Sequence, residues 1–111
     1  MIALSLLFLG HSTWGQTDIY SYLPENFDDL PYDSQYEMLD SIRRDGADRP
    51  YEINVGLSLL GMSLAEDAKD PSGVALWAST VARLYGNTGL YTEAFNYGLV
   101  SLENARKANS L

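Results

Sequence analysis

Few side chains in this sequence could carry out acid–base, nucleophilic or metal chemistry. His11 is the single histidine and the chain has no cysteine, which excludes disulfides, a thiolate nucleophile and thiolate metal sites. The paired carboxylates, Asp28-Asp29 and Glu66-Asp67, are adjacent in sequence. Consecutive side chains do not face each other on a helix, so these pairs indicate solvated surface rather than a general acid and base.

Calcium and zinc sites are equally hard to build. The acidic stretches "DDLPYD" and "DGAD" lack the regularly spaced oxygen ligands of a calcium loop. Zinc sites, like serine-type catalytic triads, mostly require histidine or cysteine. We therefore expect no enzymatic activity, no metal site and no cofactor.

The net negative charge of the chain restricts the classes of molecule that it can bind. The formal net charge is −8 with a pI of about 4.3, whereas nucleic acids and anionic membranes bind clustered lysine and arginine. Residues 18–52 hold ten acidic residues against three arginines, and residues 53–111 hold five acidic against four basic residues. The charge therefore predicts that neither nucleic acid nor an anionic membrane surface is the partner. The acidic excess near the N-terminus indicates either a solvated segment or an acidic docking tail.

The N-terminus has the features of an export signal. An apolar run, Ile2–Leu9, is followed by small and polar residues up to Gly15, which is the length of a signal-peptide core and too short to span a bilayer. Cleavage after Gly15 would remove His11. No basic residue precedes the run, and a buried N-terminal helix or strand is the alternative. We predict a signal peptide over 1–15 and export to a periplasmic or other extracytoplasmic compartment.

Residues 16–33 contain two prolines and no clean periodicity, which predicts an irregular acidic segment. We expect its apolar side chains to hold it against the rest of the domain: Tyr20, Tyr22, Phe27 and Leu30.

Four helices should follow. Apolar residues at helical spacing predict helices over Ser34–Asp45, with Ser34 or Asp33 as the N-cap, and over Pro50–Lys69. A third begins at Asp70-Pro71-Ser72 and ends before the turn Gly86–Gly89, and a fourth spans Tyr91–Asn109. Short turns and the lack of any strand pattern predict an all-α fold of antiparallel helical hairpins.

Three residues inside these helices should decide the packing. Gly56 and Gly61 interrupt the second helix and each costs about 1 kcal/mol of helix propensity relative to alanine. We interpret both as points where another helix approaches closely. Trp77 is interpreted as a core residue rather than a ligand-stacking one.

The last two helices resemble a tetratricopeptide repeat, whose pattern is W-x2-L-G-x2-Y followed by A-x3-F and a late proline. Val81, Ala82 and Tyr85 match the first helix, Ala94 matches the small position of the second, and the turn "GLYTEA" is similar to that of the family. The chain departs from the pattern where it has Ala78 for the tryptophan, Gly98 for the aromatic residue and Arg106 for the proline. The match covers 74–108 best.

A shift of 38 positions places Gly56 on Ala94 and Leu64 on Leu102. Residues 34–69 therefore resemble an earlier, degenerate repeat, and 34–111 is predicted to be a short solenoid of this type. Two repeats are few for such arrays, which favours further repeats or domains after Leu111.

The resemblance implies a protein- or peptide-binding scaffold. In this family the first helix of each repeat lines a concave groove, which implies a peptide-binding face formed by Leu76, Ser79, Arg83 and Asn87. An exposed arginine with no role beyond solubility is the competing interpretation of Arg83.

Two other functions stay open. One is the extracytoplasmic sensor portion of a membrane-bound signalling protein, such as a histidine kinase or a regulator. The other is a small helical bundle with a structural or lipid-carrying role, which a closed four-helix bundle would favour.

Overall fold

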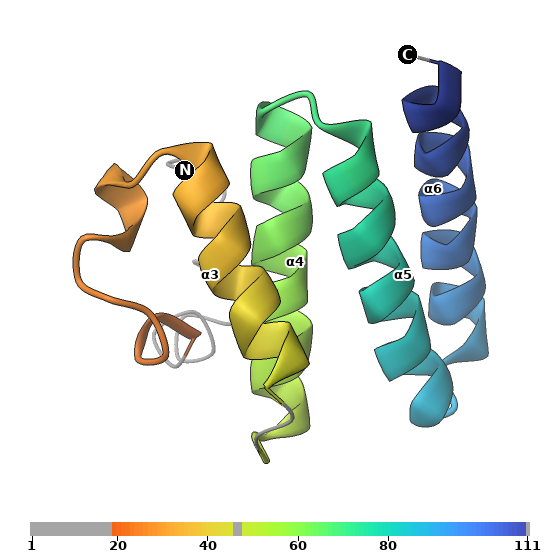
Figure 1. Ribbon diagram of the computed structural model, residues 1–111. Helices are drawn as coiled ribbons and strands as arrows, with labels where there is room; N and C mark the ends of the chain where they lie inside the picture. The colour runs from red at the N-terminus through yellow and green to blue at the C-terminus, as the bar shows by residue number, and fades with distance from the viewer. Residues whose placement is uncertain (1–18, 46–47, 111) are drawn as a thin grey trace, which may run out of the picture.

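The computed structural model describes residues 19–45 and 48–110, and this part of the chain is helical without strands. A 3₁₀ helix precedes four α-helices (Figure 1). Their bounds are η1 Phe27–Asp29, α3 Tyr32–Arg44, α4 Tyr51–Asp67, α5 Pro71–Asn87 and α6 Tyr91–Ser110. The predicted all-α fold of helical hairpins is confirmed. The predicted signal peptide lies outside the described residues.

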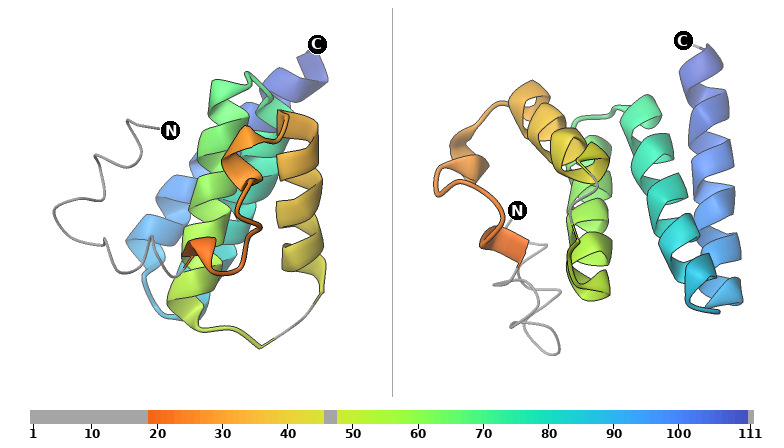
Figure 2. Two further views of the ribbon diagram at one scale, coloured as in Figure 1. Left: turned by 90° about the vertical axis from the view of Figure 1, so that its left-hand side faces the viewer. Right: turned by 60° about the horizontal axis from the view of Figure 1, so that its bottom comes forward.

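The helices stand side by side in chain order, as an open row (Figure 1). Helix α4 packs between α3 and α5, and the most extensive contact is between α5 and α6. The right-hand view of Figure 2 places α6 at the opposite end of the row from the described N-terminal segment. This is the arrangement of consecutive hairpins rather than of a closed bundle.

The buried core joins the N-terminal segment, α3, α4 and α5, and its largest side chain lies where α5 meets α4. Trp77 is 1% exposed and its indole ring lies directly over Gly61, where an added Cβ would stand 2.5 Å from the ring. Gly61 thus admits a close helix approach, as the sequence predicts. At Gly56 the side chain that approaches closely is that of Ile19, in the N-terminal segment.

Two helices begin at different residues from those expected. Helix α3 begins at Tyr32 after Pro31, with no side-chain cap, so the prediction that Ser34 or Asp33 caps it is wrong. The Pro31 carbonyl accepts the hydrogen bond from Gln35 N at 3.0 Å, and Pro31 itself is extended at ψ 157°. Pro50 likewise precedes α4, so the prediction that this helix opens at Pro50 is one residue early.

The start of α5 agrees with the sequence. Asp70 is the N-cap, its Oδ1 accepts a hydrogen bond from Gly73 N at 3.1 Å, and Pro71 occupies the first turn. Such a cap satisfies a backbone donor that has no partner within the helix.

The turn between α4 and α5 and the turn between α5 and α6 each contain one residue in the left-handed region. Lys69 (φ 56°) follows α4 and Gly89 (φ 83°) follows α5. In each turn the next residue donates back to the helix end, from Asp70 N to Ala65 O and from Leu90 N to Tyr85 O. This is the Schellman type of helix ending, in which glycine is favoured.

The N-terminal segment is anchored by Phe27, which is 1% exposed, together with Ile19 and Leu23. Gln35 of α3 donates a hydrogen bond to the Phe27 carbonyl at 3.0 Å. The anchoring role predicted for Tyr22 is wrong, because its side chain is exposed. Tyr20 and Leu30 are partly buried against the core.

Across residues 19–45 and 48–110, no helix combines the length and the apolar character needed to cross a bilayer.

Candidate functional site: an arginine-lined pocket between α3 and α5

A pocket of about 200 Å³ opens between α3 and α5, with α4 behind it. Its lining is an apolar part with an arginine-rich rim: Leu39, Ile42, Arg43, Arg49, Asn54, Leu57, Ser58, Trp77, Thr80, Arg83 and Leu84. Each helix supplies residues one turn apart, so the pocket exists only because the helices stack in this register.

The apolar part consists of buried side chains. Leu39, Leu57 and Trp77 are all 5% exposed or less. Among the described residues the Trp77 indole Nε1 has no hydrogen-bond partner, which is explained by its position over Gly61. The buried Trp77 ring therefore forms part of the pocket wall.

Two of the three arginines are held by acidic side chains. Arg43 Nη2 lies 2.7 Å from Asp40 Oδ1, and Arg44 also contacts Asp40 from outside the pocket. Burial alone would raise the pKa of Asp40, but the hydrogen bonds from Arg43 and Arg44 outweigh it and lower that pKa.

Arg49 is the most constrained of the three. Its guanidinium donates to Asp45 Oδ1 at 2.9 Å, to the Ile42 carbonyl at 2.5 Å and to Asn54 Oδ1 at 3.3 Å. Its side chain is 9% exposed. These bonds tie the end of α3 to the start of α4.

Arg83 differs from Arg43 and Arg49 because it lacks an acidic partner among the residues that the structure describes. Within the described part of the chain, no hydrogen bond or ion pair engages its guanidinium. Arg43 and Arg49 are thus paired with Asp40 and Asp45 from outside the lining, whereas the Arg83 guanidinium on the same pocket has no acidic partner among the described residues.

The four residues that the sequence predicts for one groove do not line one site in the structure. Arg83 lines the pocket. Leu76 is partly buried against the core, Ser79 is exposed and donates to the Leu76 carbonyl at 2.8 Å, and Asn87 is exposed at the end of α5. The pocket brings Arg83 together with Trp77 and Thr80 instead.

Sequence reasoning missed Arg43 and Arg49 as neighbours of Arg83. They lie 40 and 34 positions away from it, and no local pattern relates the three. Only the stacking of α5 beside α3 and α4 brings them together.

A second hollow, of about 970 Å³, lies between the C-terminal ends of α4 and α6 and the N-terminal end of α5. Acidic and basic side chains balance there: Glu66, Asp70, Glu103, Lys69, Arg106 and Lys107. Because it has no surplus charge, it offers a charged ligand less than the smaller pocket does. No cluster of three metal-ligating side chains occurs within residues 19–45 and 48–110.

Comparisons of the chain with protein-family models, with curated proteins and with solved structures found no match.

Proposed function

We propose that this protein is a tetratricopeptide-type scaffold that binds a peptide or protein, and that the pocket holds a carboxylate of that partner. The observation that carries the proposal is the unpaired Arg83 guanidinium beside an apolar pocket, between the first helices of two successive hairpins.

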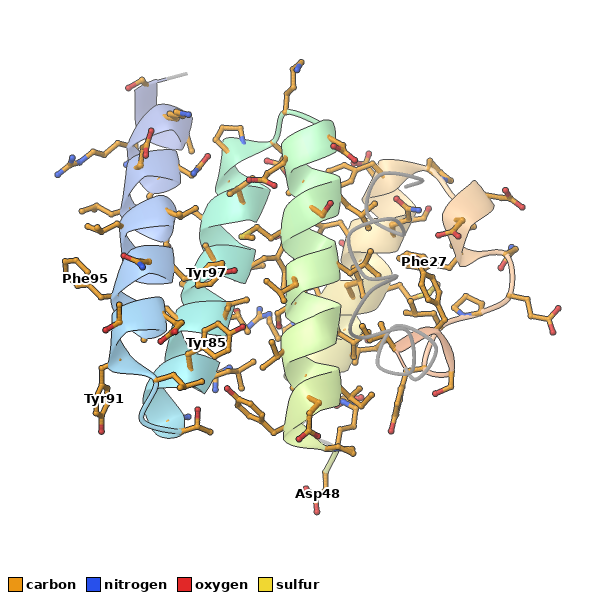
Figure 3. The ribbon with its side chains drawn as sticks, turned by 180° about the vertical axis from the view of Figure 1, so that it is seen from behind. Phe27, Asp48, Tyr85, Tyr91, Phe95 and Tyr97 are labelled. Atoms are coloured by element: carbon orange, nitrogen blue, oxygen red, sulfur yellow. The ribbon has the colours of Figure 1, made fainter. Side chains whose placement is uncertain are left out.

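The packing of α5 on α6 supports the repeat assignment. The rings of Tyr85 and Tyr97 lie 5.7 Å apart between the two helices (Figure 3). Ala94 is close to Gly86, where an added Cβ would stand 3.8 Å from the Ala94 Cβ. Small residues with tyrosines around them are what the resemblance implies for a repeat contact.

The size of the pocket supports a peptide rather than a small molecule. Sites for drug-sized ligands span roughly 300–1,000 Å³, and this pocket is about 200 Å³. It has room for one side chain or a chain terminus. The unpaired Arg83 guanidinium matches one carboxylate, which arginine binds through paired, charge-assisted hydrogen bonds.

A peptide library provides the test. Peptides with an acidic side chain or a free C-terminal carboxylate, next to an apolar residue, should bind the purified chain. C-terminal amides of the same peptides should bind less tightly where the terminus is the ligand. Trp77 lines the pocket and the chain has only two tryptophans, so intrinsic fluorescence should report occupancy.

Alanine substitutions test which residues of the chain bind the peptide. Arg83→Ala should weaken binding by about tenfold or more, since a charge-assisted hydrogen bond contributes about 1.5–3 kcal/mol. Arg106→Ala is the matched control, because Arg106 is also exposed but lies on α6 outside the pocket. Asn87→Ala tests the other polar residue of the predicted groove. Equal affinity of the Arg83 and Arg106 variants, with unchanged circular dichroism, would refute the pocket as the site.

A sensor role after export stays a prediction, and the sequence that follows Leu111 in the gene would test it. A membrane-spanning run there would favour the sensor over a free scaffold.

A further inference from the structure

Two buried hydroxyl groups form the floor of the arginine-lined pocket. Ser58 of α4 is 4% exposed and Thr80 of α5 is 6% exposed, and both residues line the pocket. Each hydroxyl donates its proton within its own helix, Ser58 Oγ to the Asn54 carbonyl at 2.9 Å and Thr80 Oγ1 to the Leu76 carbonyl at 3.0 Å. Because a hydroxyl has one proton and two lone pairs, both oxygens offer the pocket only hydrogen-bond acceptors.

The packing of α4 on α5 brings these two hydroxyls together. The helices are antiparallel (Figure 1) and meet where Trp77 lies over Gly61. Ser58 precedes Gly61 by three residues, and Thr80 follows Trp77 by three residues. Each step is about one helical turn, and in antiparallel helices the two steps run in the same direction. Ser58 and Thr80 therefore lie side by side, one turn away from that contact.

The floor needs a donor that the chain does not supply. No described residue donates a hydrogen bond to Ser58 Oγ or to Thr80 Oγ1. Buried polar groups are normally hydrogen-bonded, and an apolar ligand group at the floor would keep these lone pairs from water without replacing the lost hydrogen bonds. The part of a ligand that reaches the floor must therefore carry an N–H or O–H group.

The rest of the lining selects among such donors. Arg43, Arg49 and Arg83 lie around the pocket, so a lysine ammonium would meet like charges. The short side chains of serine and threonine would leave the buried side chains Leu39 and Leu57 uncovered. A phenol has an apolar ring with a donor at its tip, and guanidinium groups stack favourably on aromatic rings. A tyrosine side chain therefore matches both the walls and the floor.

We propose that the pocket binds a tyrosine side chain of the partner, next to the acidic group that Arg83 holds. The ring lies between Leu39 of α3 and Trp77 of α5, and the phenol hydroxyl donates to the oxygen of Ser58 or Thr80. This inference rests on the proposed peptide-binding function and adds the identity of the side chain that enters the pocket. Ser58 and Thr80 thus determine specificity.

Two peptides that differ by one oxygen atom test the proposal. They have the same sequence except that one has tyrosine and the other phenylalanine beside an aspartate, and calorimetry measures the affinity of each for the full chain. The tyrosine peptide should bind about tenfold more tightly, because phenylalanine leaves both buried acceptors unmatched. Equal binding of the two peptides would overturn the tyrosine assignment and leave peptide binding intact. Failure of both peptides, and of every acidic peptide in the library, would overturn the proposed function as well.

The matched variants are Thr80→Val and Ser79→Ala. Both hydroxyls donate to the Leu76 carbonyl, but only Thr80 lines the pocket. Valine keeps the shape of threonine without its oxygen, so Thr80→Val should reduce the tenfold preference for tyrosine, and Thr80→Val with Ser58→Ala should abolish it. Ser79→Ala should keep the full preference, with the same helical circular dichroism. A preference that survives the double variant would contradict the role of the hydroxyls. The peptide comparison on the unaltered chain does not depend on the stability of any variant.

A phosphotyrosine peptide separates the floor from the arginines. Its phosphate carries a charge of about −1.5 to −2 at pH 7 and three acceptor oxygens, which would face the acceptors of Ser58 and Thr80. The phosphotyrosine peptide should therefore bind more weakly than the tyrosine peptide. Tighter binding would show that the arginines select the ligand and the hydroxyls do not, and would overturn the proposal.

Discussion

Tyr32, the first residue of α3, donates a hydrogen bond to Oδ2 of Asp70, the N-cap of α5, at an oxygen–oxygen distance of 2.5 Å. The two residues are 38 positions apart. The same carboxylate accepts from Gly73 N through its other oxygen. One side chain thus starts α5 and joins it to the first helix of the preceding hairpin.

Replacing Tyr32 with phenylalanine should lower the free energy of unfolding by about 1–2 kcal/mol, because a hydrogen bond to a charged group is lost at a partly buried site. Tyr91→Phe is the matched control: Tyr91 is 73% exposed and its change should have little effect. Urea denaturation of both variants measures the difference. Equal midpoints would show that the Tyr32–Asp70 bond adds no stability.

The same bond should make stability depend on alkaline pH. Burial, the hydrogen bond to Asp70 and the nearby Asp70 charge raise the pKa of Tyr32 above its ordinary value of 10.0. The hydroxyl must be protonated to donate, so its contribution is full below pH 10 and is lost as the pH rises through the raised pKa. The stability difference between wild type and Tyr32→Phe should be constant from pH 7 to about 9.5 and shrink above 10. A difference that stays constant above pH 10 would contradict this assignment.

Gly61→Ala should destabilise the protein by about 1–3 kcal/mol through overpacking, because the added methyl would collide with the Trp77 ring. Gly98→Ala provides the control in α6, where nothing lies within 4 Å of the added atom. There alanine should stabilise by up to about 1 kcal/mol through helix propensity. Thermal melting should separate the two variants in opposite directions, and a shift of the same sign in both would be inconsistent with the packing described.

Ala94→Leu should cost about 1–3 kcal/mol where α6 meets α5, and Asn96→Leu, at an exposed position of the same helix, should cost little. Unchanged melting of Ala94→Leu would weaken the tetratricopeptide resemblance, which requires a small residue at this contact.

Lys69 and Gly89 both adopt a positive φ, so introducing glycine at one and removing it at the other should change the stability in opposite directions. Lys69→Gly should stabilise the protein by up to about 1 kcal/mol, since glycine adopts a positive φ without strain. Gly89→Ala should destabilise it by a similar amount. Chemical denaturation tests both, and a stabilising Gly89→Ala would contradict the turn geometry.

The sequence by itself determined the approximate bounds of the four α-helices that the structure describes between residues 32 and 110. Apolar periodicity and proline positions are local signals, and Asp70 with Pro71 identifies the start of α5 because a cap acts within one helical turn. The start of α3 was predicted two residues late. Ser34 and Asp33 have the composition of a cap, but the Pro31 carbonyl already accepts the first bond of that helix.

Only the tertiary structure decided which side chains meet. Arg83 was recognisable as a lone basic residue, but its neighbours Arg43 and Arg49 reach it through helix stacking, and contacts over more than thirty positions have no local pattern. Phe95 of α6 falls on Leu57 of α4 under the 38-position shift. One is exposed and the other buried, because burial depends on whether another helix stands beside that position and not on the apolar residue that occupies it.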